Sequence, residues 1–199
     1  MSKIRIGIIG LGYVGLPLAR LFATKYAVIG FDINTKRVDD LKKGRDFTQE
    51  VDDNLLKAVL TNVSSDKNGL FITDSSTFLK GCNYYIVTVP TSVDKNNQPV
   101  LIPLITASKT ISKYLQKNDI VIYESTVYPG ATEEDCIPVL EKESGFVFNQ
   151  DFFVGYSPER ISPGDKVRTV ENILKVTSGS NANTAKKVDD LYKSVIAAG

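Results

Sequence analysis

The 199-residue sequence has no histidine, no tryptophan, one methionine and only two cysteines. Without histidine, the chain cannot contain a Ser-His or Cys-His nucleophile pair, a histidine general base or a histidine metal ligand. Cys82 and Cys136 are far apart and form no CxxC motif, which argues against a zinc knuckle or a redox pair. We therefore predict no metal site and interpret both cysteines as reduced structural thiols of a cytoplasmic protein.

The sequence also lacks an excess of either charge and any long apolar run. Lys and Arg number 24 against 23 Asp and Glu, so nothing favours nucleic acid or an anionic membrane surface as a partner. No stretch approaches the roughly 20 apolar residues that span a bilayer. The length fits one domain, or one domain and the beginning of a second. The expected partner is a small molecule.

The sequence does contain a regular alternation of apolar runs and helical patterns. The predicted strands cover 3–9, 27–32, 70–73, 84–89, 119–124, 152–155 and 173–177, and the predicted helices cover 13–25, 35–43, 52–60, 101–116, 131–142 and 182–197. Several strands are apolar along their whole length, as in parallel strands buried on both faces. This pattern predicts a doubly wound α/β domain of three layers, with a mostly parallel Rossmann sheet.

A GxGxxG motif formed by Gly10, Gly12 and Gly15 lies between the first predicted strand and the first predicted helix. In this setting the first glycine allows a tight turn, the second lets the backbone approach a pyrophosphate, and the third lets helix and strand pack closely. The amino end of the helix then attracts the phosphates. The motif predicts a dinucleotide site, with a purely structural turn as the alternative.

Asp32 ends the second predicted strand, where a carboxylate accepts hydrogen bonds from the two ribose hydroxyls of an adenosine. The same carboxylate would repel a 2′-phosphate, so NAD is favoured over NADP. Alternatively, Asp32 only caps the helix that begins near Thr35. Arg37, one helical turn further on, is predicted either to lie along the adenosine or to be a solvated surface residue.

Ligands of open parallel sheets bind beyond the carboxyl ends of the strands. Val89-Pro90-Thr91 follows the fourth predicted strand and Ser125-Thr126 follows the fifth. Their hydroxyl and amide groups are predicted to lie near the nicotinamide half of a dinucleotide. The alternative is that these hydroxyls cap the following turns or helices.

A third strand end carries Glu159 and Arg160 within Ser-Pro-Glu-Arg-Ile-Ser-Pro-Gly. The carboxylate can act as a general acid or base, and the planar guanidinium can hold a phosphate or carboxylate. The alternative is a surface ion pair in a loop stiffened by proline.

The segments GLGYVGLPLA, FDIN, VPT, ESTVYPG and YSPERISPG occur in one order along the chain. Together they resemble the amino-terminal NAD-binding domain of the UDP-glucose/GDP-mannose dehydrogenase family. The SPERxxPG segment is similar to the branch acting on UDP-N-acetylhexosamines (UDP-N-acetylmannosamine, UDP-N-acetylgalactosamine or UDP-N-acetylglucosamine), whereas UDP-glucose enzymes typically have PEFLxEG there.

The resemblance implies oxidation of C6 of a UDP-N-acetylhexosamine, or of UDP-glucose, from alcohol to carboxylate with two NAD. The product would be a precursor of cell-surface polysaccharide. The resemblance implies that NAD contacts Tyr13, Val14, Asp32, Arg37, Thr91 and Thr126. It also implies that Arg160 and Ile161 contact the sugar nucleotide, that Glu159 lies near the reacting centre, and that Thr126 helps to position the attacking water.

The family also uses a cysteine in a GGxC loop and a lysine on a long central helix, and neither feature occurs in this sequence. We therefore expect residues 1–199 to be the NAD-binding domain of a longer, homodimeric or higher-order enzyme. This fragment would lack the central helix and the UDP-sugar domain, and would bind NAD without turnover. The alternatives are a β-hydroxyacid or 6-phosphogluconate dehydrogenase domain and a non-catalytic NAD-sensing domain.

Overall fold

The computed structural model describes residues 3–160, 164, 169–196 and 198. Its strands are β1 (Arg5–Ile9), β2 (Ala27–Phe31), β3 (Gly69–Thr73), β4 (Tyr84–Val87), β5 (Ile120–Tyr123), β6 (Phe153–Tyr156) and β7 (Ser178–Gly179). Its α-helices are α1 (Gly15–Ala23), α2 (Thr35–Lys42), α3 (Asp53–Val59), α4 (Ile102–Ser112), α5 (Ile137–Ser144) and α6 (Ala182–Lys193). A 3-10 helix, η1 (Ser76–Leu79), precedes β4, and a π-helical turn, η2 (Thr132–Cys136), leads into α5.

The strands form one sheet in the order β3-β2-β1-β4-β5-β6-β7. The first six are parallel, and the short β7 pairs antiparallel with β6. The predicted doubly wound Rossmann sheet is therefore confirmed. Since the strand order reverses between β1 and β4, the crevice at their carboxyl ends is the place where such a sheet binds its ligand.

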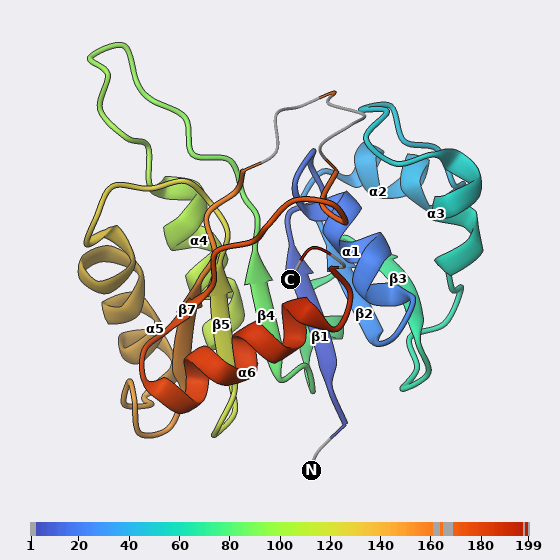
Figure 1. Cartoon of the computed structure of the whole chain (residues 1–199). Helices are drawn as coiled ribbons and strands as arrows, with labels where there is room; N and C mark the ends of the chain where they lie inside the picture. The colour runs from blue at the N-terminus through green and yellow to red at the C-terminus, as the bar shows by residue number, and fades with distance from the viewer. Residues whose placement is uncertain (1–2, 161–163, 165–168, 197, 199) are drawn as a thin grey trace.

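Helix α6 crosses the sheet in front of β4 and β5 (Figure 1). The strands bury alternate side chains on opposite faces of the sheet. Ile6, Ile8 and Ile122 belong to one apolar cluster together with side chains of α1 and α6. Val121 and Tyr123 belong to a second cluster together with side chains of α4 and α5. Helices therefore cover both faces, which explains why the strands are apolar along their whole length.

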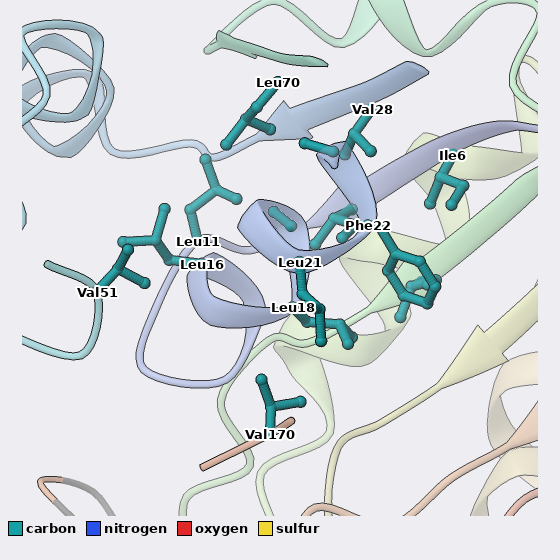
Figure 2. Packing of buried hydrophobic residues seen from close by; sticks show 14 of the residues in the cluster. Ile6, Leu11, Leu16, Leu18, Leu21, Phe22, Val28, Val51, Leu70 and Val170 are labelled. Carbon is teal, nitrogen blue, oxygen red and sulfur yellow. The ribbon is translucent and has the colours of Figure 1, made fainter. Parts of the chain in front are cut away.

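Helix α1 fixes the amino-terminal half of the first face. Figure 2 shows its side chains, among them Leu18 and Phe22, directed toward the strands and toward two flanking segments that carry Val51 and Val170. Leu18 and Phe22 are almost fully buried. Burying such side chains stabilises by about 1.5–3 kcal/mol each, so α1 and the loop that precedes it are held rigidly against the sheet.

The prediction of a strand over residues 173–177 is wrong, because only Ser178 and Gly179 join the sheet there. The apolar residues Leu174 and Val176 are 60% and 51% exposed, whereas Lys175 between them is buried. The burial expected from the apolar pattern is thus reversed, because the Lys175 side chain is directed inward to the buried carboxylate of Glu124. The predicted final helix is found as α6, and residue 197 lies outside the described residues.

Asp119 directly precedes β5 and is 3% exposed. Its carboxylate accepts a hydrogen bond from the Gln116 backbone N–H at 2.8 Å, and burial raises its pKa to about 7. Between its usual pKa and this value the folded protein keeps a proton that the unfolded chain has lost. The free energy of unfolding therefore falls as pH rises through this window, by up to about 1.4 kcal/mol per pH unit.

Asp119→Asn tests this linkage. The amide oxygen still accepts from Gln116 but the side chain cannot ionise, so we expect a flatter stability profile and a protein more stable than wild type at pH 8. Urea unfolding of both proteins between pH 4 and pH 8 measures the difference. Two parallel profiles would contradict the raised pKa.

Among the residues that the structure describes, no helix combines the length and the apolar character needed to cross a membrane.

Candidate functional site

A cavity of about 340 Å³ opens at the carboxyl ends of β1, β4 and β5. It is lined by Gly10, Gly12, Tyr13, Val14, Asp32, Thr88, Val89, Pro90, Thr91, Ser92, Glu124, Ser125, Thr126 and Glu159. The structure thus brings together all the residues predicted for the cofactor except Gly15 and Arg37. Cavities of this size with a few polar groups are typical small-molecule sites.

The glycine loop is held tightly against β2 and β4. Gly10 has a φ of +95°, a conformation that favours glycine, and its N–H donates to the Phe31 carbonyl oxygen at 2.8 Å. A Cβ at Gly15 would lie 1.9 Å from the Gly10 carbonyl oxygen and 2.4 Å from Thr88 Oγ1. Gly15 therefore lies behind the cavity, where it lets α1 pack against the strand.

Gly12 is at the open side of the same loop. A Cβ built there meets no atom within 4 Å in the described structure, and Gly12 lines the cavity. Among the described residues, no side chain caps the amino end of α1. The positive end of the helix dipole therefore faces a space that suits an anion.

Asp32 both supports the loop and lines the cavity. Its Oδ2 accepts from the Leu11 N–H at 2.7 Å and its Oδ1 accepts from the Asn34 N–H at 2.8 Å. Asn34, not Asp32, is the N-cap of α2, because its side chain accepts from Arg37 N. Each carboxylate oxygen of Asp32 keeps one further lone pair, so the group can also accept from a diol.

Arg37 does not line the cavity. Its Nε donates to the Leu11 carbonyl oxygen at 3.0 Å, and its Nη1 pairs with Asp46 at 2.7 Å. Burial by itself would raise the pKa of Asp46, but hydrogen bonds from Thr48, Val51 and Arg37 bring it below its usual value. In this structure Arg37 therefore braces the glycine loop from outside.

Hydroxyl groups join the strand ends to each other. Thr88 Oγ1 donates to the Gly10 carbonyl oxygen at 2.7 Å, and Ser125 Oγ donates to the Val89 carbonyl oxygen at 2.6 Å. These bonds fix the loops after β4 and β5 relative to the glycine loop. The Ser125 proton is thus used within the protein, while Thr91 and Thr126 also line the cavity.

Glu159 and Arg160 take different directions. Glu159 lines the cavity, and its Oε1 accepts from the Arg160 backbone N–H at 2.6 Å. The Arg160 guanidinium donates to the Leu174 carbonyl oxygen at 3.0 Å, and this side chain is exposed beside the cavity rather than lining it. Ile161 lies outside the described residues.

Sequence reasoning missed a buried polar cluster beside the cavity. Glu124, which is 0% exposed, forms an ion pair with Lys175 and accepts a hydrogen bond from the Tyr192 hydroxyl. Burial raises the pKa of Glu124, and the charge of Lys175 and the Tyr192 hydroxyl oppose that rise. Burial also raises the pKa of Tyr192, which keeps the hydroxyl protonated as a donor.

A partial signal for this cluster exists in the sequence. Glu124 directly follows an apolar strand, and Lys175 interrupts a short apolar run. Ionisable residues in such places need a countercharge when buried. No spacing rule, however, connects positions 124, 175 and 192.

Both cysteine thiols lie away from the cavity lining and are buried. Burial raises the pKa of Cys82 to about 12 and that of Cys136 to about 11. Neither thiol is therefore ionised at neutral pH, as a nucleophile would need to be. In the described part of the chain, no group of three or more Cys, Asp or Glu side chains is arranged to hold a metal ion.

A model of the UDP-glucose/GDP-mannose dehydrogenase family, NAD binding domain, matches residues 4–196. This chain belongs to that family. The resemblance inferred from the motifs is therefore confirmed, and NAD is the cofactor of this family's domain. The cavity fits NAD, because it combines an open glycine backbone, an uncapped helix end and the Asp32 carboxylate.

Several family members are similar over the whole chain. UDP-N-acetyl-D-glucosamine 6-dehydrogenases from Pseudomonas aeruginosa and Salmonella typhi are 55% and 49% identical over 199 residues. A solved structure of UDP-D-ManNAc dehydrogenase from Pyrococcus horikoshii is 33% identical, with a TM-score of 0.87 over 97% of this chain. The chain covers 45% of the length of each of these three proteins.

Proposed function

We propose that this chain is the NAD-binding part of a UDP-N-acetylhexosamine 6-dehydrogenase, which oxidises the C6 alcohol of its substrate to a carboxylate. The observation that carries the proposal is the cavity at the switch point, in which the glycine loop, Asp32 and Glu159 face one space. The high identity to two UDP-N-acetyl-D-glucosamine 6-dehydrogenases supports this substrate class. The product would serve cell-surface polysaccharide synthesis.

NAD supplies a hydride acceptor when bound. The open backbone at Gly12 and the amino end of α1 would hold its pyrophosphate, and Asp32 would accept from the adenosine ribose. Tyr13 and Val14 would cover the dinucleotide beside the loop. Arg37 would act through Leu11, because its guanidinium holds that carbonyl in the structure.

The nicotinamide half would lie against the loops after β4 and β5. Val89, Pro90, Thr91 and Ser125 would form its walls, since all four line the cavity. Thr126 would position the attacking water, and Glu159 would take or return the proton at the reacting centre. Arg160 and Ile161 would contact the sugar nucleotide.

We further propose that residues 1–199 are one domain of a longer enzyme. The fragment would bind NAD but turn over little, because its two cysteines are buried and protonated and the GGxC segment is absent from it. The full protein would assemble as a homodimer or larger oligomer. The free, unpaired thiols fit a cytoplasmic location.

Asp32→Asn tests the cofactor site. We expect wild type to bind NAD more tightly than NADP, because a 2′-phosphate would meet the Asp32 carboxylate. Removing this charge should weaken NAD binding by about tenfold or more and remove the preference. Calorimetric titration of both proteins with both nucleotides measures the effect.

Asp39→Asn is the matched control, because Asp39 is an exposed residue of the following helix α2 and does not line the cavity. It makes the same change in charge and should leave both affinities unchanged. Absence of NAD binding by wild type, or equal losses in both variants, would overturn the proposed site.

A further inference from the structure

Lys175 is a buried cation outside the regular elements, on the segment between β6 and β7. Its side chain is only 2% exposed. Its Nζ pairs with Glu124, lies 3.5 Å from the Pro158 carbonyl oxygen and lies 3.9 Å from Glu159 Oε2. The Lys175 ammonium group therefore lies beside the Pro158 backbone and beside the Glu159 side chain. The same Glu159 side chain lines the cavity.

The groups around this ammonium group come from three parts of the fold. Glu124 follows β5, Glu159 follows β6, and Tyr192 of α6 presents its hydroxyl to Glu124 and its ring centroid 5.8 Å from Lys175 Nζ. The Arg160 guanidinium is directed away, to the Leu174 carbonyl oxygen. Two carboxylates that both line the cavity thus share the positive charge of Lys175.

Stability alone does not account for this arrangement. A buried ion pair is often no more stabilising than apolar side chains of the same volume, because both charges lose their hydration. A pair formed only for packing would also not need a second carboxylate beside it. The geometry instead lets Lys175 act on Glu159, with Glu124 as the countercharge that keeps the ammonium in place.

We propose that Lys175 is a positioning residue, which holds the Glu159 carboxylate directed into the cofactor cavity. Glu124 and Tyr192 orient Lys175 in turn. This inference rests on the proposed function, in which Glu159 takes or returns a proton at the reacting centre. None of the sequence motifs that indicated the family includes Lys175.

The pH profile of the Glu159 carboxyl resonance tests the proposal in this chain without turnover. The sequence contains eight glutamates, so a sample labelled with ¹³C at the glutamate carboxyl carbon gives few resonances. Glu159→Gln and Glu124→Gln identify the two that matter. The profile is compared among wild type, Lys175→Met, Lys175→Arg and Glu124→Gln.

Opposite shifts are expected for the two neutralising variants. Lys175→Met removes the positive charge beside the Glu159 carboxylate, so the pH profile of the Glu159 resonance should move to higher pH. Glu124→Gln leaves Lys175 with Glu159 as its remaining carboxylate, so the profile should move to lower pH. Lys175→Arg keeps the charge and should restore a profile close to wild type. General loosening of the structure would move the two variants in the same direction.

The double variant Glu124→Gln with Lys175→Met is the control for effects on folding, because it replaces the buried ion pair by a neutral pair. Lys175→Met alone should lower Tm by about 10 °C, and the double variant should recover much of that loss. Its Glu159 profile should still lie at higher pH than that of Glu124→Gln. Equal profiles in those two proteins would overturn the positioning role.

The same samples separate this inference from the proposed function. If wild type fails to bind NAD in calorimetry, the proposed function fails, whereas the response of Glu159 to Lys175 remains measurable. If NAD binds but the Glu159 profile does not respond to Lys175→Met or Glu124→Gln, the positioning role fails and the cofactor site stands.

Discussion

Gly15→Ala is expected to destabilise the protein by about 3 kcal/mol or more, which lowers Tm by about 10 °C. The new Cβ would lie 1.9 Å from the Gly10 carbonyl oxygen and 2.4 Å from Thr88 Oγ1. Both atoms belong to the contact between the glycine loop and the end of β4, so neither can move without separating α1 from the sheet. Thermal unfolding followed by circular dichroism measures the loss.

Gly12→Ala is the matched control, with the same change of side chain three residues earlier. Its Cβ meets no described atom within 4 Å, so Tm should change little. The methyl group would, however, occupy space beside the expected pyrophosphate, so NAD affinity should fall at least tenfold. Equal Tm values for Gly15→Ala and Gly12→Ala would contradict the packing role of Gly15. Unchanged NAD affinity in Gly12→Ala would contradict the approach of the pyrophosphate.

Glu124→Leu is expected to destabilise the fold by about 3–5 kcal/mol, the usual cost of removing one partner from a buried ion pair. Leucine is similar in size, so the loss comes mainly from charge. The Lys175 ammonium would remain 2% exposed without its nearest carboxylate, and the Tyr192 hydroxyl would lose its acceptor. Urea unfolding of both proteins at pH 7 measures the difference.

Lys186→Ala provides the comparison with a surface ion pair. Lys186 and Asp190 form an i,i+4 pair on α6 with side chains 74% and 59% exposed. Water screens such pairs, so its loss should change the free energy of unfolding by less than about 0.5 kcal/mol. Similar small effects for Lys186→Ala and Glu124→Leu would mean that water reaches Glu124 in solution.

The fold could be predicted from the sequence because its determinants are local. Apolar strands such as β1 and β2, the glycine loop between β1 and α1, and Asp32 at the end of β2 all lie within the first 32 residues. Each is recognised by spacing along the chain. A parallel sheet then places consecutive strand ends at one edge, which is why residues as distant as Val89 and Thr126 could be assigned to the same cavity.

Individual side chains near the cavity could not be assigned in the same way. Arg37 was predicted either to lie along the adenosine or to be a solvated surface residue, whereas its guanidinium pairs with Asp46 and the Leu11 carbonyl oxygen. Lys175 was placed in a strand, yet its side chain turns inward to Glu124. In both cases the charged group pairs with a group that the fold brings beside it, and the local apolar pattern does not indicate where that group lies.

The sequence by itself therefore determined the family, the doubly wound sheet and the position of the cavity, because these follow from periodicity and from short motifs. Only the tertiary structure decided that Glu124, Lys175 and Tyr192 meet beside Glu159. These residues come from three separated segments, and their contact depends on how α6 and the segment before β7 pack against β5. The contact among these residues is energetically important, because burying a charge is costly unless an opposite charge or a hydrogen-bonding group lies beside it.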